Sequence, residues 1–226
     1  MRIGIIIPDR GDRPELLKNC LRMLKTQTIQ PVAVELVNHA PISERPDITE
    51  RYRIGYDKLR NKNLDVIAFI ENDDWYSPDY LETMVLAWCD HGKPTIFGTN
   101  YTYYYHIKLF QYFTMYHDQR SSAMSTLIKP DMYFPWCPDN EPFTDLYLWQ
   151  KFGNAGKDTI FKPKKTICMG IKHGIGLCGG KSHVDRLNRY EHLDTDKSFL
   201  KNIMKEDSES FYFYSNYFSN ERIIKS

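Results

Sequence analysis

The chain has 226 residues, of which 42% are hydrophobic and 26% charged, as in an ordinary soluble globular protein. Its formal net charge of +1 gives no overall electrostatic attraction to nucleic acid. The five cysteines include no Cys-x-x-Cys pair, which argues against a zinc site or a disulfide framework and fits free thiols in a reducing cytosol.

The N-terminal half alternates strands and helices. Its first strand begins within the first few residues, which leaves no room for a signal peptide, and no apolar run reaches the roughly 20 residues that cross a membrane. We therefore expect a soluble, cytoplasmic protein without a membrane span. Strands are predicted at 2–8, 32–37 and 66–70, and helices at 14–27, 49–63 and 79–91. This alternation predicts a parallel sheet with right-handed crossovers.

The C-terminal half has a different pattern. Residues 95–116 and 121–129 are rich in Thr, Tyr, Phe and Ile with a period near two, which predicts antiparallel or mixed strands. The further predicted elements are a helix at 143–152, a strand at 160–169, a glycine-rich loop at 173–180, a helix at 197–205 and a packed aromatic tail at 211–218. No repeat or linker interrupts the chain, so we expect one α/β domain.

The most informative segment is 66–82, VIAFIENDDWYSPDYLE, in which an apolar strand ends in Glu71, Asn72, Asp73 and Asp74. Carboxylates gathered at the carboxyl end of a buried strand repel one another unless a counter-ion is present. A divalent cation with oxygen ligands is a common remedy, and such a cation commonly holds a diphosphate. The alternative is a solvated acidic turn at the start of the next helix.

Three segments, in order, resemble the GT-A glycosyltransferases of the family 2 type: IGIIIPDRGDRPELLKNCLRMLKTQT (3–28), DVIAFIENDDWYSPDYLE (65–82) and FTDLYLWQKF (143–152). The resemblance implies a single GT-A (Rossmann-like) domain over 1–226. Its nucleotide-sugar-binding half would be 1–95, its acceptor-binding half 96–195 and its C-terminal tail 196–226. It also implies a metal-dependent, inverting enzyme that moves a sugar from a UDP-sugar to an acceptor hydroxyl.

The resemblance further implies that Asp73 and Asp74 bind Mn²⁺ or Mg²⁺, with Glu71 supporting them. The ligating pair is ambiguous, because the acidic run can be aligned with the family's Asp-x-Asp motif in more than one way. A late histidine, His173 or His183, is expected as a further ligand, which would favour manganese. For either histidine, the alternative is a side chain hydrogen-bonded within a loop.

In the helix predicted at 143–152, the resemblance assigns Asp145 as the general base that deprotonates the acceptor, with Glu141 as the reserve candidate. An acidic residue in the first turn of a helix is also favoured by the helix dipole, which is the structural alternative. The two roles are compatible.

The predicted donor-binding residues lie after the first strands or on the second helix: Pro8, Arg10, Arg13, Asn38, Arg53, Asn72 and Asp73. The family usually has an aspartate after the second strand to hold the nucleobase. This sequence instead has ELVNHAP (35–41), so Asn38 or His39 would have to substitute. Arg10 and Arg13 could instead be surface charges paired with neighbouring aspartates.

Trp136 and Tyr103 are the predicted acceptor-binding residues, because aromatic rings stack on sugars and bases. For Trp136, the alternative is a buried side chain that anchors its loop. For Tyr103, the alternative is a side chain on the face of its strand that points into the protein core.

A narrower resemblance, carried by PDRGDRP (8–14), ENDDWY (71–76) and KHGIG (172–176), is to phage-type enzymes that glycosylate 5-hydroxymethylpyrimidines in DNA. It implies a DNA partner with hydroxymethylated bases. Such a partner would need local basic patches, such as 162–165, and a target base taken out of the stack. The alternatives are a saccharide acceptor, a nucleotidyltransferase and a non-catalytic sugar-binding module. The sequence does not predict the oligomeric state.

Overall fold

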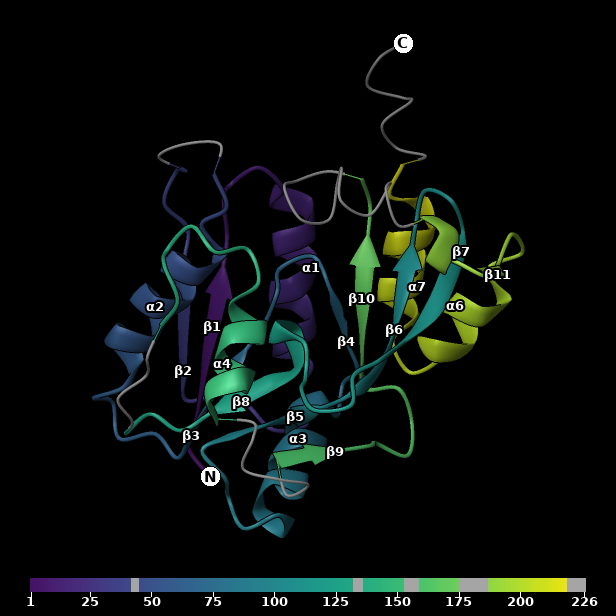
Figure 1. Ribbon diagram of the computed structural model, residues 1–226. Helices are drawn as coiled ribbons and strands as arrows, with labels where there is room; N and C mark the ends of the chain where they lie inside the picture. The colour runs from purple at the N-terminus through teal and green to yellow at the C-terminus, as the bar shows by residue number, and fades with distance from the viewer. Residues whose placement is uncertain (42–44, 132–135, 153–158, 175–186, 219–226) are drawn as a thin grey trace.

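The computed structural model describes residues 1–41, 45–131, 136–152, 159–174 and 187–218. Two β-sheets with flanking helices form a mixed α/β structure, as the sequence predicts (Figure 1). Within those ranges, no helix is long and apolar enough to pass through a membrane.

The main sheet has six strands in the order β2-β1-β3-β8-β5-β9. Their bounds are β1 (Ile3–Pro8), β2 (Ala33–Val37), β3 (Val66–Phe69), β5 (Ile96–Thr99), β8 (Thr126–Ile128) and β9 (Ile160–Phe161). β1 pairs in parallel with both β2 and β3, which confirms the arrangement predicted from the strand–helix alternation. β8 is antiparallel to β3 and β5, so the sheet becomes mixed where the second half of the chain joins it.

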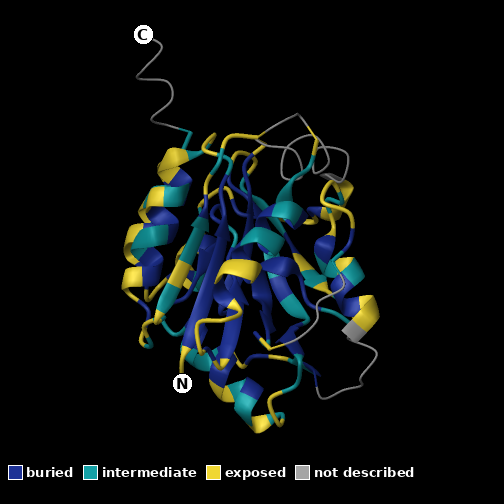
Figure 2. Cartoon of the chain, turned by 90° about the vertical axis from the view of Figure 1, so that its left-hand side faces the viewer, coloured by how far each residue is buried: buried dark blue, intermediate teal, exposed yellow. Residues whose placement is uncertain are grey.

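Helices cover both faces of the main sheet. Their bounds are α1 (Pro14–Lys25), α2 (Ile48–Leu59), α3 (Tyr80–Asp90) and α4 (Thr144–Phe152). One core cluster joins α1 and α3 to Ile3, Ile5 and Ile7, and the other joins α2 and α4 to Ile6. Because successive side chains of a strand point to opposite faces, β1 contributes to both layers. Figure 2 shows the resulting buried strands between helices whose outer surfaces are exposed.

The second sheet has the order β11-β7-β6-β10-β4. Its strands are β4 (Trp75–Tyr76), β6 (Tyr101–His106), β7 (Gln111–Tyr116), β10 (Cys168–Lys172) and β11 (His192–Leu193). The mixed pairing predicted for this half is confirmed, since β6 is antiparallel to β7 and parallel to β10. The strand predicted at 160–169 is instead two strands in different sheets, because Pro163 and the lysines around it interrupt the apolar pattern. β4 and β11 have two residues each, too short for a period-two pattern to be detected.

The C-terminal segment folds back onto the N-terminal part of the chain. It contains α6 (Ser198–Ile203) and α7 (Ser208–Asn216), and α7 holds most of the aromatic segment predicted to pack. Asp207 caps α7 by accepting a hydrogen bond from the Ser210 amide at 3.2 Å. Arg22 of α1 pairs with the same carboxylate, Nη1 to Oδ1, at 3.0 Å. α7 is therefore fixed against α1.

Candidate active site

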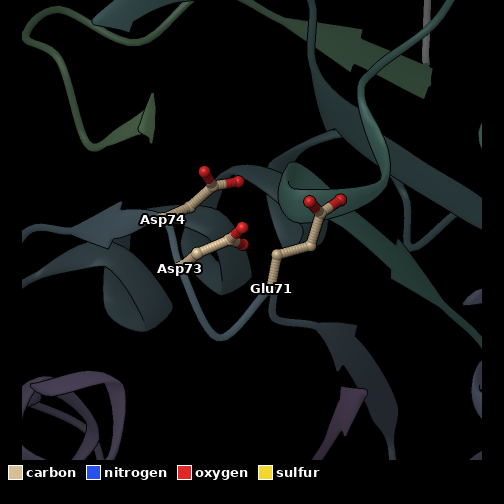
Figure 3. Close-up of side chains that lie close together, drawn as sticks. All are labelled: Glu71, Asp73 and Asp74. Carbon is tan, nitrogen blue, oxygen red and sulfur yellow. The ribbon is translucent and has the colours of Figure 1, made fainter. Parts of the chain in front are cut away.

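An acidic turn connects β3 to β4. The chain leaves the buried strand β3, passes Glu71, Asp73 and Asp74, and enters the second sheet at Trp75. One carboxylate oxygen from each of the three acids lies within 4.8 Å of the other two (Figure 3). The turn therefore brings three carboxylates together where β3 meets the second sheet.

Asp74 is the most deeply buried of the three, with no exposed surface. Its Oδ1 accepts a hydrogen bond from the Ile171 amide at 2.8 Å and lies 4.0 Å from Lys172 Nζ. Its Oδ2 is buried and has no hydrogen-bond partner in the part of the chain that the structure describes. Burial raises the pKa of Asp74 to about 7, although the nearby charge of Lys172 opposes the rise.

Asp73 is held by two partners from distant parts of the chain. Arg13 Nη1 donates to Asp73 Oδ2, and His173 Nε2 lies 3.1 Å from the same oxygen. Burial alone would raise the pKa of Asp73, but the charge of Arg13, the hydrogen bond with His173 and the charge of Lys172 together outweigh it, so the pKa lies well below its ordinary value. The surroundings of Asp73 therefore favour its ionised form.

Glu71 completes the cluster from a half-buried position. Burial and the adjacent Asp74 carboxylate raise the pKa of Glu71 well above its ordinary value. Lys172 is buried and faces the ring of Tyr104 at 4.9 Å. Burial alone would lower the pKa of Lys172, but the carboxylates of Asp74, Asp73 and Glu71 and the neighbouring Tyr104 together raise it above its ordinary value, so the lysine stays charged.

These residues fit a hard divalent cation. Such ions take oxygen ligands, and three carboxylates supply them within one small space. The buried Asp74 Oδ2 is the kind of polar atom that is costly to leave without a partner. His173 is 1% exposed and lies against Asp73, where the sequence places a candidate metal-ligating histidine. The other predicted histidine, His183, lies outside the described residues, as does most of the glycine-rich loop.

The loop after β1 adjoins the acidic turn. Pro8 is the buried last residue of β1, and Asn72 Nδ2 donates to Asp9 Oδ1 at 2.6 Å. Arg51 of α2 is 1% exposed and donates to the carbonyl oxygens of Asp9 and Val37, at 2.5 and 3.0 Å. Arg51 thereby connects the ends of β1 and β2, which makes it a structural support of the site.

The other predicted donor-binding residues lie around this loop. Arg10 Nη1 pairs with Asp47 Oδ1 at 2.9 Å, and Asn38 is exposed just after β2. Arg53 makes a two-pronged contact with Asp139 at 2.9 and 2.8 Å. Both arginines therefore have acidic partners. For Arg10, the partner is Asp47 and not one of the aspartates next to it in the sequence.

Asp145 lies in the first turn of α4, as predicted, and is mostly buried. Arg120 Nη1 donates to Asp145 Oδ2. Burial raises the pKa of Asp145, while Arg120 opposes the rise. The charge of Asp145 contributes to the raised pKa of Glu71, which places it in the same electrostatic environment as the acidic turn. No sequence pattern marks Arg120, because it contacts Asp145 from 25 positions earlier in the chain.

Glu141 and the two predicted acceptor-binding aromatics have structural contacts. Glu141 Oε1 accepts a hydrogen bond from the Phe143 amide at 3.2 Å, just before α4. Trp136 is half-buried and packs against Phe69, with ring centroids 6.4 Å apart, close to the strand that carries the acidic turn. Tyr103 lies in the second sheet, and its hydroxyl is 3.0 Å from that of Tyr101.

Solved structures show the same architecture. The fold is similar to that of S. aureus TarS in two crystal structures of its residues 1–349, one of them in complex with UDP-GlcNAc. Both superpose with a TM-score of 0.50. The UDP-GlcNAc complex is 11% identical and covers 80% of this chain and 61% of the TarS chain. The other structure is 12% identical and covers 76% of this chain and 60% of the TarS chain. The chain has a GT-A-type fold. This agrees with the fold that the sequence resemblance implies.

Sequence comparison adds one relative. No protein-family model matches the chain. The chain is 32% identical to the Bacillus subtilis (strain 168) protein named "Putative glycosyltransferase EpsH" over a segment covering 30% of this chain and 25% of that protein. The chain thus spans a quarter of EpsH and about three fifths of the TarS chain.

Proposed function

We propose that the chain is a metal-dependent, inverting glycosyltransferase that transfers a sugar from a UDP-sugar to an acceptor hydroxyl. The observation that carries this proposal is the acidic turn, with three converging carboxylates and a buried Asp74 oxygen that lacks a hydrogen-bond partner among the described residues. In open α/β sheets, ligands bind at the carboxyl ends of the strands, where this turn lies. The name of EpsH supports glycosyl transfer, and the UDP-GlcNAc bound by TarS supports a UDP-sugar donor.

Asp73 and Asp74 are the proposed ligands of Mn²⁺ or Mg²⁺, with Glu71 beside them and His173 as the candidate nitrogen ligand. When bound, the cation would stabilise the negative charge that develops on the diphosphate as its bond to the sugar breaks. The protein's own contribution is to hold the ligands in place and to keep Asp73 charged. Arg13 does this for Asp73 through a direct ion pair.

Asp145 is the proposed general base. Its carboxylate would take the proton of the acceptor hydroxyl while that oxygen bonds to the anomeric carbon and UDP leaves from the opposite face. The ion pair with Arg120 orients the carboxylate and favours its charged form. Glu141 remains the reserve candidate, although its side chain accepts a hydrogen bond from the Phe143 amide.

The proposed donor site is the loop region around the carboxyl ends of β1 and β2. Its predicted contacts to the UDP-sugar are Pro8, Arg10, Arg13, Asn38, Arg53, Asn72 and Asp73. For the acceptor, Trp136 and Tyr103 remain the proposed stacking residues. A hydroxymethylated pyrimidine in DNA and a saccharide are the two acceptor classes carried forward from the sequence.

Donor hydrolysis tests this proposal directly. The protein is incubated with several UDP-sugars and Mn²⁺, and released UDP is measured for the wild type, Asp73→Asn and, as a matched control, Asp90→Asn, whose side chain is exposed at the end of α3. We expect UDP release by the wild type and the control, and its loss in Asp73→Asn and after chelation. Absence of release with every donor, or equal release by Asp73→Asn, would refute the glycosyltransferase assignment.

The acceptor class is tested by adding acceptors to the same reaction. Hydroxymethyluracil DNA, hydroxymethylcytosine DNA, unmodified DNA and oligosaccharides are compared by mass spectrometry of the product. A mass increase of one sugar on hydroxymethylated DNA alone would identify the base as the acceptor. Transfer to oligosaccharides alone would identify a saccharide.

A further inference from the structure

The C-terminal helix α7 contacts the backbone of the acidic turn. Tyr214, on α7, is 1% exposed, so its hydroxyl is shielded from water. This hydroxyl lies 3.2 Å from the carbonyl oxygen of Asp74 and 3.4 Å from that of Asp73, and donates to both. One side chain thus connects residues 140 positions apart in sequence.

The residue that caps α7, Asp207, contacts Trp75, the residue that follows the turn. Trp75 directly follows Asp74, and its indole Nε1 donates to Asp207 Oδ2 at 3.2 Å. Asp207 is itself fixed by Arg22 of α1 and by the Ser210 amide. Hydrogen bonds with α7 and its capping residue Asp207 therefore restrain Asp73, Asp74 and Trp75 in succession.

These restraints matter because the turn has to hold carboxylates that repel one another. Glu71, Asp73 and Asp74 present oxygens within 4.8 Å, and two of them are almost fully buried. Their side chains can converge only if the backbone that carries them keeps its path. Some groups orient metal ligands without touching the metal. Removing such a group commonly weakens metal binding.

We propose that Tyr214 is a positioning residue for the cation site, which makes the C-terminal helix part of the site's construction. Its hydroxyl fixes the peptide groups of Asp73 and Asp74 so that both carboxylates face Glu71. This inference rests on the proposed function, because it assumes that the acidic turn binds a divalent cation.

Tyr214→Phe is the test variant, and Tyr56→Phe is its matched control. Tyr56 is fully buried on α2, and its hydroxyl also donates to two consecutive backbone carbonyls, those of Lys129 and Pro130, at 3.2 and 3.0 Å. Both changes remove one hydroxyl and keep the ring. Each should therefore lower the midpoint of urea unfolding by a similar amount.

Mn²⁺ affinity of the full chain separates the two variants. It is measured by electron paramagnetic resonance of free Mn²⁺, well below the unfolding temperature. We expect the dissociation constant to rise about tenfold in Tyr214→Phe and to stay unchanged in Tyr56→Phe. Unchanged affinity in Tyr214→Phe, with wild-type protein binding Mn²⁺, would overturn this inference and leave the proposed function intact.

Two further outcomes are decisive. If wild-type protein binds no Mn²⁺, the metal dependence in the proposed function fails and this inference fails with it. If Tyr214→Phe does not fold, Asp207→Asn replaces it, because that change weakens the anchoring of α7 and of Trp75 while keeping the shape of the side chain. Weaker Mn²⁺ binding by Asp207→Asn supports the inference, and wild-type affinity overturns it.

Discussion

Replacing Asp74 with Asn should stabilise the protein while abolishing cation binding. Asp74 has no exposed surface, and its neighbours include two other carboxylates. The amide of Asn has nearly the same shape, its oxygen can still accept the hydrogen bond from the Ile171 amide, and it removes a charge that burial disfavours. The site is therefore a place where function opposes stability.

The magnitude follows from the raised pKa of Asp74. The difference between a pKa of about 7 in the folded protein and the ordinary value of 3.8 corresponds to about 4 kcal/mol. Because the folded protein holds this proton more tightly than the unfolded chain, the penalty is absent below pH 3.8, grows as pH rises, and is complete above about pH 7. Asp74→Asn should thus match the wild type near pH 4 and exceed it by up to about 4 kcal/mol at pH 8.

Urea unfolding in the presence of a chelator, at several pH values from 4 to 8, measures this difference. Asp90→Asn is the control for a general effect of charge removal, because its side chain is exposed. Isothermal titration with Mn²⁺ then checks that the more stable variant no longer binds the cation. A variant less stable than the wild type at pH 8, or a stability difference that does not depend on pH, would refute the reasoning.

Three other predictions concern the base, the packing of α2 and the ligand. Arg120→Gln should raise the pKa of Asp145 and move the acidic limb of the pH profile of kcat/KM to higher pH; an unmoved limb would exclude Asp145 as the base that Arg120 assists. Gly55→Ala should destabilise the protein by about 1–3 kcal/mol in urea unfolding, because the added Cβ would lie 2.4 Å from Ile6 Cγ2, and a neutral result would show that β1 can shift. UDP with Mn²⁺ at about 100 times its dissociation constant should stabilise the fold by about 2.7 kcal/mol, seen as a higher melting temperature; UDP alone giving the same rise would argue against metal-linked binding.

Local patterns account for the parts of the fold and of the candidate site that the sequence predicts. The apolar runs of β1 and β3 are buried on both faces, so they stand out in the sequence and place the acidic residues at the carboxyl end of the interior strand β3. The first-turn position of Asp145 follows from the helix pattern around it. The fold and the position of the acidic turn could therefore be predicted from residues close together in the chain.

The supporting contacts could not be predicted in the same way, because each joins segments far apart in sequence. Arg51 binds carbonyl oxygens at the ends of two strands, and Tyr214 binds carbonyl oxygens of the acidic turn. Backbone carbonyls are present at every position, so no residue type in the sequence signals such a partner. Arg120 likewise reaches Asp145 from an irregular segment that no periodicity describes.

The balance of charge at the acidic turn gives an electrostatic reason to expect the nucleotide to bind with a cation. Among the described residues, Arg13 pairs with Asp73 and Lys172 lies near Asp74. Burial, together with repulsion from the neighbouring carboxylates, still raises the pKa values of Glu71 and Asp74, so their charged forms are disfavoured. A diphosphate would add negative charge to a site that already disfavours it. A divalent cation reverses this, because it favours ionised Asp74 and attracts the diphosphate at the same time. UDP affinity should therefore rise steeply with Mn²⁺ concentration, and by thermodynamic linkage Mn²⁺ affinity should rise by the same factor with UDP.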